Sequence, residues 1–168
     1  MTSYPADLQK VIDFHGHLCP GVLLGYRASL IALRELRTSP SSDEELVATV
    51  YNDSCAADAV QVMTGCTFGK GNLIFKDLGK LVFLFSKRGE AQSLRIALRY
   101  GALSKDAMNM LLDMPDDSLY QISRVEVEQP PQAKIYSTIQ CSICGEGAME
   151  PRVRVKDGKF VCLECADS

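Results

Sequence analysis

CSICGEGAMEPRVRVKDGKFVCLEC, residues 141–165, decides the fold of the C-terminal part of this chain. It holds two Cys-x-x-Cys pairs, and seventeen residues lie between the pairs. Each pair spans a tight turn, and the Asp157-Gly158 turn between two alternating segments lets the stretch fold back as a hairpin. Four thiolates at about 2.3 Å from one centre form a structural zinc site. The sequence therefore predicts a zinc module whose ligands are Cys141, Cys144, Cys162 and Cys165.

The residues before this module are numerous enough for one hydrophobic core. The chain has 168 residues, of which 46% are hydrophobic and 23% are charged, as in an ordinary globular domain. The Pro-containing stretch QPPQ at 129–132 is typical of a stiff linker. We expect a core domain over 1–128, a linker over 129–140 and a four-cysteine zinc finger over 141–168.

The periodicity of apolar residues within the core predicts both helices and strands. Helical spacing predicts helices over 6–14, from Pro20 to about 37, from the caps Asn52, Asp53 and Ser54 to about 63, and over 104–114. β-branched or alternating runs predict strands at 46–51 and 124–129, a half-exposed strand at 93–100 that could form a sheet edge, and a hairpin over 72–86 with a turn at Gly79. The expected fold class is α+β, with a mainly antiparallel sheet packed by helices and a small treble-clef or zinc-ribbon module at the C-terminus.

Composition argues against several classes of function. The formal net charge is −3, whereas non-specific nucleic-acid binding needs a cationic surface. The chain contains no apolar run of about 20 residues, and its first residues lack the pattern of a signal peptide. Seven cysteines at metal-ligand spacing fit a reducing compartment better than a disulfide framework. We therefore expect a cytoplasmic protein that binds neither membranes nor nucleic acid.

A second cluster of histidine and cysteine lies in FHGHLC, residues 14–19. If this stretch is extended, the side chains of His15, His17 and Cys19 project to the same side. Cys19 precedes one predicted helix and Cys55 begins another, and the positive end of a helix dipole favours a thiolate. The alternative for Cys55 and for Cys66 is an ordinary buried thiol.

Imidazole and thiolate together suit zinc or a similar divalent ion. The sequence predicts a second metal, with zinc favoured, held in the core by His17, Cys19 and Cys55; His15 and Cys66 are alternate ligands. The same His17, Cys19 and Cys55 are the candidates for catalysis if the protein is an enzyme. Asp53 could be a fourth ligand, a partner of a ligand or only a helix cap.

The glycine-rich GCTFGKGN, residues 65–72, departs from a phosphate loop. Only three residues separate its first two glycines, and a predicted strand follows where a helix is required. We therefore reject nucleotide binding by this loop and expect its glycines to allow tight turns. Lys70 is the one candidate there for an anion contact.

Taken together, FHGHLCPG at 14–21, GYR at 25–27, NDSCAADAVQVMTGCTFGKGNL at 52–73 and the C-terminal cysteine pairs resemble the FmdE family, named for the E component of formylmethanofuran dehydrogenase. The resemblance implies an α+β core, commonly dimeric, with a cavity lined by the histidine and cysteine positions named above. It also implies a treble-clef zinc finger, although only three residues follow Cys165 here to form its last helix. Nothing in the chain resembles the pterin-binding or iron–sulfur regions of those dehydrogenases.

Three hypotheses follow. The first is a metal-binding accessory protein of molybdenum or tungsten enzyme metabolism, a homodimer that associates with subunits of such enzymes. The second is an enzyme in its own right, in which the core metal activates water or Cys19 acts as a nucleophile. The third is an interaction module whose zinc finger docks a partner chain.

Overall fold

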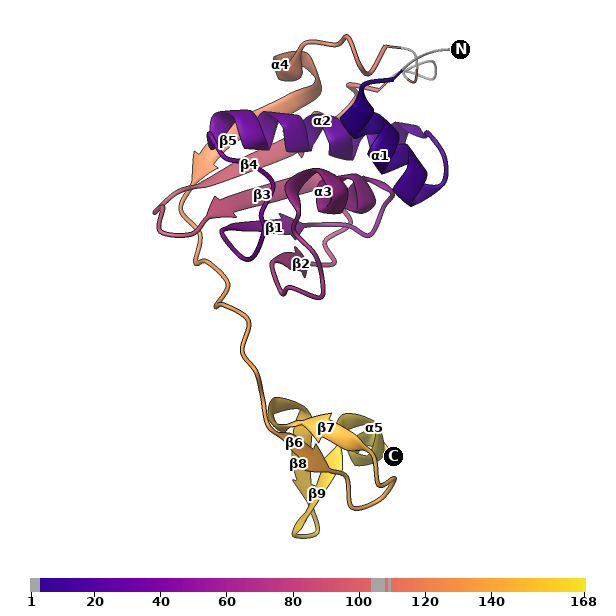
Figure 1. The fold of residues 1–168 in the computed structure, drawn as a ribbon, viewed down its shortest axis with the longest axis vertical. Coiled ribbons are helices and arrows are strands. Elements are labelled where there is room, and N and C mark those ends of the chain that lie inside the picture. Colours follow the sequence, from indigo (N-terminus) through magenta and orange to yellow (C-terminus); the bar gives the residue numbers. More distant parts are fainter. Residues whose placement is uncertain (1–3, 104–107, 109) are drawn as a thin grey trace. The chain divides into compact units, whose positions relative to one another are not determined.

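The chain forms two compact units. The computed structural model describes residues 4–103, 108 and 110–168, and its contacts divide the chain into Met1–Gln132 and Ala133–Ser168 (Figure 1). The first unit contains a five-stranded sheet, and the second contains two two-stranded sheets. In the part of the chain that the structure describes, no helix has both the length and the apolar character needed to cross a bilayer.

Three helices of the first unit lie together over one face of its sheet (Figure 1). They are α1 (Ala6–His15), α2 (Pro20–Glu35) and α3 (Ala56–Thr64). Gly16 ends α1 with φ of 95°, and Gly65 ends α3 with φ of 68°, a backbone conformation that glycine adopts without steric cost. Pro20 begins α2, where its missing N–H costs no hydrogen bond. These three predicted helices are confirmed to within one or two residues.

The sheet is mainly antiparallel, as predicted. It comprises β1 (Leu46–Val50), β2 (Leu73–Phe75), β3 (Val82–Lys87), β4 (Ser93–Leu98) and β5 (Tyr120–Val125). The strand order is β2-β1-β3-β4-β5, and β1/β2 is the one parallel pair within it. The short helix α4 (Asp116–Leu119) leads directly into β5. The apolar β3 occupies the centre of the sheet, which confirms that part of the strand prediction.

Three strand predictions were wrong. The hairpin over 72–86 does not form, because β1 lies between β2 and β3 and α3 carries the chain across to a parallel β2. β4 is not an edge strand, because β3 and β5 both pair with it, so the edges are β2 and β5. The last strand ends at Val125 rather than covering 124–129. The helix predicted over 104–114 lies largely outside the described residues.

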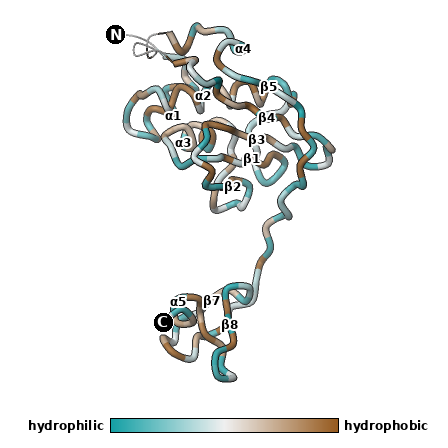
Figure 2. Tube along the Cα trace, turned by 180° about the vertical axis from the view of Figure 1, so that it is seen from behind, coloured by the Kyte–Doolittle hydropathy of each residue, from teal (hydrophilic) through white to brown (hydrophobic). Residues whose placement is uncertain are grey.

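The core forms between the helices and the inner face of the sheet. Phe83 and Phe85 of β3 pair across the sheet with Ile96 and Leu94 of β4, and all four side chains are buried. Figure 2 shows the hydrophobic colour along β1 and β3 in the middle of this unit. The buried Tyr120 donates a hydrogen bond of 2.7 Å from its hydroxyl to the carbonyl of Leu24. This bond ties the start of β5 to α2.

A glycine allows α2 and α3 to approach closely. A Cβ atom added at Gly25 would lie 2.2 Å from the carbonyl oxygen of Ala56, at the start of α3. Only a residue without a side chain permits this contact between helix backbones. The close approach brings the N-terminal ends of α2 and α3 together, and these ends carry Cys19 and Cys55.

The second unit is built from two hairpins and a short final helix. Its elements are β6 (Thr138–Gln140), β7 (Gly147–Met149), η2 (Glu150–Arg152), β8 (Val153–Lys156), β9 (Lys159–Cys162) and α5 (Leu163–Asp167). Asp157 and Gly158 both have positive φ, of 51° and 72°, as the turn between β8 and β9 requires. The predicted hairpin is therefore confirmed. The last helix has five residues, so it is present but short.

Candidate metal centres

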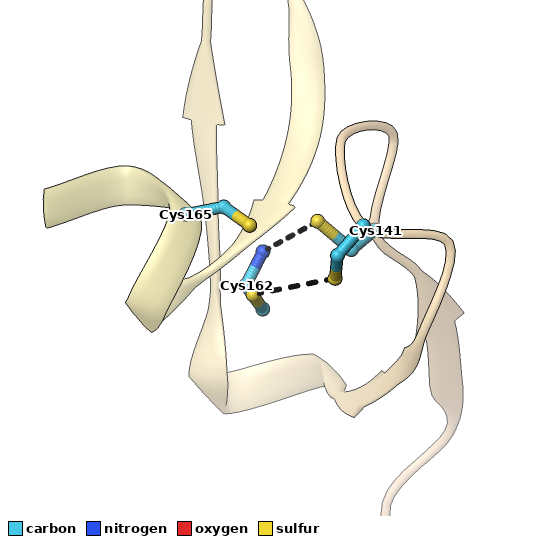
Figure 3. Close-up of side chains that lie close together, drawn as sticks. Cys141, Cys162 and Cys165 are labelled. Carbon is cyan, nitrogen blue, oxygen red and sulfur yellow. Dashed lines mark hydrogen bonds between the residues drawn. The ribbon is translucent and has the colours of Figure 1, made fainter. Parts of the chain in front are cut away.

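The four cysteines of the second unit converge on one point. Cys141 and Cys144 lie on the turn between β6 and β7, Cys162 ends β9, and Cys165 lies in α5. Their sulfur atoms all lie within 4.8 Å of one another, and the Sγ atoms of Cys144 and Cys162 are 4.0 Å apart. Figure 3 shows Cys141, Cys162 and Cys165 turned toward a common centre. Sulfurs at about 2.3 Å from a tetrahedral zinc ion are separated by similar distances, so the cluster fits zinc.

Backbone amides around the first cysteine favour its thiolate. The amides of Cys162 and Ile143 donate to Cys141 Sγ at 3.3 and 3.5 Å. Hydrogen bonds from the backbone amides of Cys144, Cys162 and Ile143 lower the pKa of Cys141 to about 6. Hydrogen bonding with Cys162, together with desolvation, raises the pKa of Cys165 to about 12. One thiolate opposes the next, and a divalent cation is what allows all four to ionise together.

A second group of donor atoms lies where the three helices of the first unit meet. His15 is the last residue of α1, Cys19 caps the N-terminus of α2, and Cys55 immediately precedes α3. One ring nitrogen of His15 and the two Sγ atoms lie within 4.8 Å of one another. Three helix ends, distant in sequence, thus place one imidazole and two thiols around a shared centre.

Glycine also sets the spacing within this second group. A Cβ atom added at Gly21 would lie 3.0 Å from the Cβ of Cys55 and 3.8 Å from the sulfur of Cys19. The first distance is tighter than ordinary contacts. The two cysteines therefore approach one another across a glycine in the first turn of α2.

The orientation of His15 matches that of a metal ligand. Its Nδ1 lies 2.7 Å from Oδ2 of Asp58, and its Nε2 is buried with no hydrogen-bond partner among the described residues. A buried imidazole nitrogen without a partner costs free energy, and a metal ion would satisfy it. The Asp58–His15 contact is the carboxylate–histidine pairing that orients metal-binding histidines. The residues present therefore fit a metal ion.

Asp58 is the site residue that sequence reasoning missed. It lies in the first turn of α3, three residues after Cys55. Residues at i and i+3 share a helix face, so a Cys-x-x-Asp spacing at a helix start was the available signal. The pairing with His15 spans 43 residues, and that partner was not visible in the sequence.

The segment around the histidines is not extended as expected. Helix α1 continues through His15, and the left-handed Gly16 then turns the chain. The group of donor atoms consequently contains His15, whereas the sequence analysis preferred His17. The imidazole of His17 is exposed, with its ring centroid 4.7 Å from that of His15.

The other predicted donors lie elsewhere or carry a different role. Cys66 is fully buried, donates to the carbonyl of Leu46 at 3.3 Å, and has a pKa raised by burial, as expected of a structural thiol. Desolvation, followed by the neighbouring Cys19, raises the pKa of Cys55. The expected shift toward thiolate at the helix start is therefore outweighed in that residue.

Neighbouring polar residues also take roles that differ from the predictions. Asn52 and Ser54, rather than Asp53, make the hydrogen bonds of the turn before α3. Lys70 donates to the backbone carbonyl of Ser41 at 2.9 Å, so its ammonium group is held by the loop that precedes β1.

Fold and sites define the class: a small α+β domain with a histidine–cysteine cluster, joined to a four-cysteine zinc finger. The chain belongs to the FmdE family. The family model described as "FmdE, Molybdenum formylmethanofuran dehydrogenase operon" matches residues 14–141. A second model, "Prokaryotic dksA/traR C4-type zinc finger", matches residues 134–168. The resemblance inferred from the sequence motifs is confirmed.

Two known proteins resemble the chain over most of its length. A crystal structure of an FmdE-like protein of tungsten formylmethanofuran dehydrogenase, from Syntrophus aciditrophicus, superposes with a TM-score of 0.70 and 22% sequence identity, covering 95% of this chain and 89% of that one. This similarity supports the fold. A "Probable S-adenosyl-L-methionine-binding protein" from Archaeoglobus fulgidus is 32% identical over 96% of this chain and 52% of its own length. The chain thus spans about half of that curated relative.

Proposed function

We propose that this protein is a metal-binding accessory protein with two metal sites of different kinds. The four cysteines of the second unit form the structural site for zinc. His15, Cys19 and Cys55 of the first unit hold a second divalent ion, with Asp58 orienting His15. The observation that carries the proposal is the buried His15 Nε2, which has no partner among the described residues and lies beside two thiols.

Zinc is the ion that this second donor set suits best. Zinc accepts imidazole nitrogen and thiolate sulfur together, whereas magnesium and calcium select oxygen ligands. Three protein ligands leave one tetrahedral position for water or another ligand, the arrangement of a working rather than a structural zinc site. We infer a reducing, cytoplasmic location, because thiolates must stay unoxidised to bind metal.

The accessory role rests on the family. Membership of the FmdE family supports an association with subunits of molybdenum or tungsten formylmethanofuran dehydrogenases. We further propose that the protein is a homodimer, which light scattering of the purified chain would test. The open fourth ligand position favours a second candidate function, an enzyme in which the metal activates bound water.

The test is metal analysis of the purified full-length chain and of matched variants. We expect two zinc equivalents per chain in the wild type and one in Cys55→Ser, with the protein still folded by circular dichroism. His17→Ala is the matched control, since it removes the neighbouring imidazole that lies outside the donor group, and it should retain two equivalents. One equivalent in the wild type, or two in Cys55→Ser, would refute the core site.

A further inference from the structure

A pocket lies beside the histidine–cysteine cluster, between α3 and the strands β1 and β2. Its volume is about 240 Å³. Val50, Ala57 and Leu73 form its apolar wall, and Asp58 contributes to its polar side. Because Asp58 also contacts His15, one carboxylate belongs both to the pocket and to the cluster. This space, called here the α3–β2 pocket, is the cavity nearest to the proposed metal that the described residues define.

The charged side chains of the α3–β2 pocket are all acidic. Asp53 and Asp58 line it, and its lining, all of it within the described residues, contains no lysine, arginine or histidine. Among the described residues, the Asp53 carboxylate has no hydrogen bond or ion pair. The side-chain amide of Gln61 is likewise left available to a ligand. Anions are therefore disfavoured in this pocket, and a cation that donates hydrogen bonds is favoured.

Two aromatic rings stand exposed at the pocket. Phe68 is 71% exposed and Phe75 is 40% exposed, although both line the α3–β2 pocket. Water-exposed phenyl groups gain free energy when a ligand covers them. The face of a phenyl ring also attracts an organic cation, and this attraction strengthens as the cation loses water.

We propose that the α3–β2 pocket binds a small organic cation, an ammonium group on a short apolar or aromatic body. The ammonium group pairs with Asp53 and Asp58, and the apolar body lies against Phe68, Phe75 and the apolar wall. The volume lies below the range of about 300–1,000 Å³ typical of drug-sized ligands, so the ligand is small. The pocket stands on its own lining, and only its placement beside a metal rests on the proposed function.

Three probes of similar shape and different charge test this proposal on the full-length chain. They are 2-phenylethylamine, which is cationic at neutral pH, 2-phenylethanol, which is neutral, and 3-phenylpropanoate, which is anionic. Protein-observed NMR titrations should show saturable shifts with the amine at the amides of Asp53, Asp58, Gln61 and Phe68. The alcohol should bind at least about fivefold more weakly, and the anion should produce no shifts at these residues.

Variants separate the pocket from its surroundings. Asp53→Asn should weaken amine binding by about two- to fivefold, the effect of one partly exposed ion pair, and Phe75→Ala by a similar factor. Asp77→Asn is the matched control, since it removes an exposed carboxylate two residues beyond Phe75 that does not line the pocket. It should leave amine binding unchanged.

Several results would overturn the proposal. These are equal binding of the alcohol and the amine, shifts confined to other surfaces, no shifts at all, or equal effects of Asp77→Asn and Asp53→Asn. Zinc content measured on the same samples keeps the two proposals distinct. One zinc per chain with amine binding intact would refute only the core metal. Two zinc ions with no amine binding would refute only the α3–β2 pocket.

Discussion

Replacing Gly25 by alanine tests whether the contact between α2 and α3 is as close as the structure indicates. The new Cβ atom would lie 2.2 Å from the carbonyl oxygen of Ala56 and 2.8 Å from its Cα. Real Cβ contacts essentially never fall under 3.0 Å, so the backbones must separate by the shortfall of about 0.8 Å. The obstructing atoms belong to the backbone, which cannot rotate away as a side chain can.

The magnitude follows from two opposing effects. Alanine in place of glycine inside a helix stabilises it by about 1 kcal/mol. Overpacking of a buried contact costs about 1–3 kcal/mol, and the immobile backbone places this contact at the upper end. We therefore expect Gly25→Ala to lower the free energy of unfolding by about 2 kcal/mol. For a unit of this size the melting temperature should fall by about 6–10 °C.

The assay is thermal unfolding followed by circular dichroism, together with zinc analysis. Gly69→Ala is the matched control, because its new Cβ would meet nothing within 4 Å, and its stability should stay within about 0.5 kcal/mol of the wild type. Separation of the helices also moves Cys55 away from Cys19, so Gly25→Ala should retain less core metal than the control. A variant as stable as Gly69→Ala would refute the close helix contact.

Three further predictions concern the two metal sites and one ion pair. Asp58→Ala should weaken binding of the core metal by about 10–100-fold, measured by chelator competition, whereas Asp77→Ala should not; equal affinities would remove Asp58 from the site. Excess EDTA should unfold Ala133–Ser168 and leave the NMR signals of the five-stranded sheet dispersed, and a finger that stays folded without zinc would contradict this. Desolvation raises the pKa of Asp116, but hydrogen bonds from Arg27 and then Arg34 outweigh it, so the pKa lies below its usual value. This carboxylate therefore stabilises the fold fully above the unfolded pKa of about 3.9 and loses that contribution as the pH falls through its lowered folded pKa. The gap in melting temperature between wild type and Asp116→Asn should shrink between pH 6 and pH 3, and a constant gap would refute the pairing.

Local patterns in the sequence were sufficient for most elements and for the zinc finger. Helix starts and stops were correct because Pro20 and Gly65 act within one turn of the chain. The ligands of the finger were equally accessible, since each cysteine pair forms its own turn and the Asp157-Gly158 turn determines the hairpin between the pairs. In these cases the decisive contacts lie within a few residues of one another.

The strand order and the composition of the core site depended on contacts distant in sequence. β1 enters between β2 and β3 because its apolar side chains are buried on both faces, and no local pattern distinguishes that arrangement from a hairpin. The choice of His15 followed from one additional helical residue at the end of α1 and from Asp58, 43 residues away. The sequence by itself determined which residues could bind metal, whereas tertiary packing at Gly25 decided which helix ends meet, because donor atoms converge only where backbones can approach.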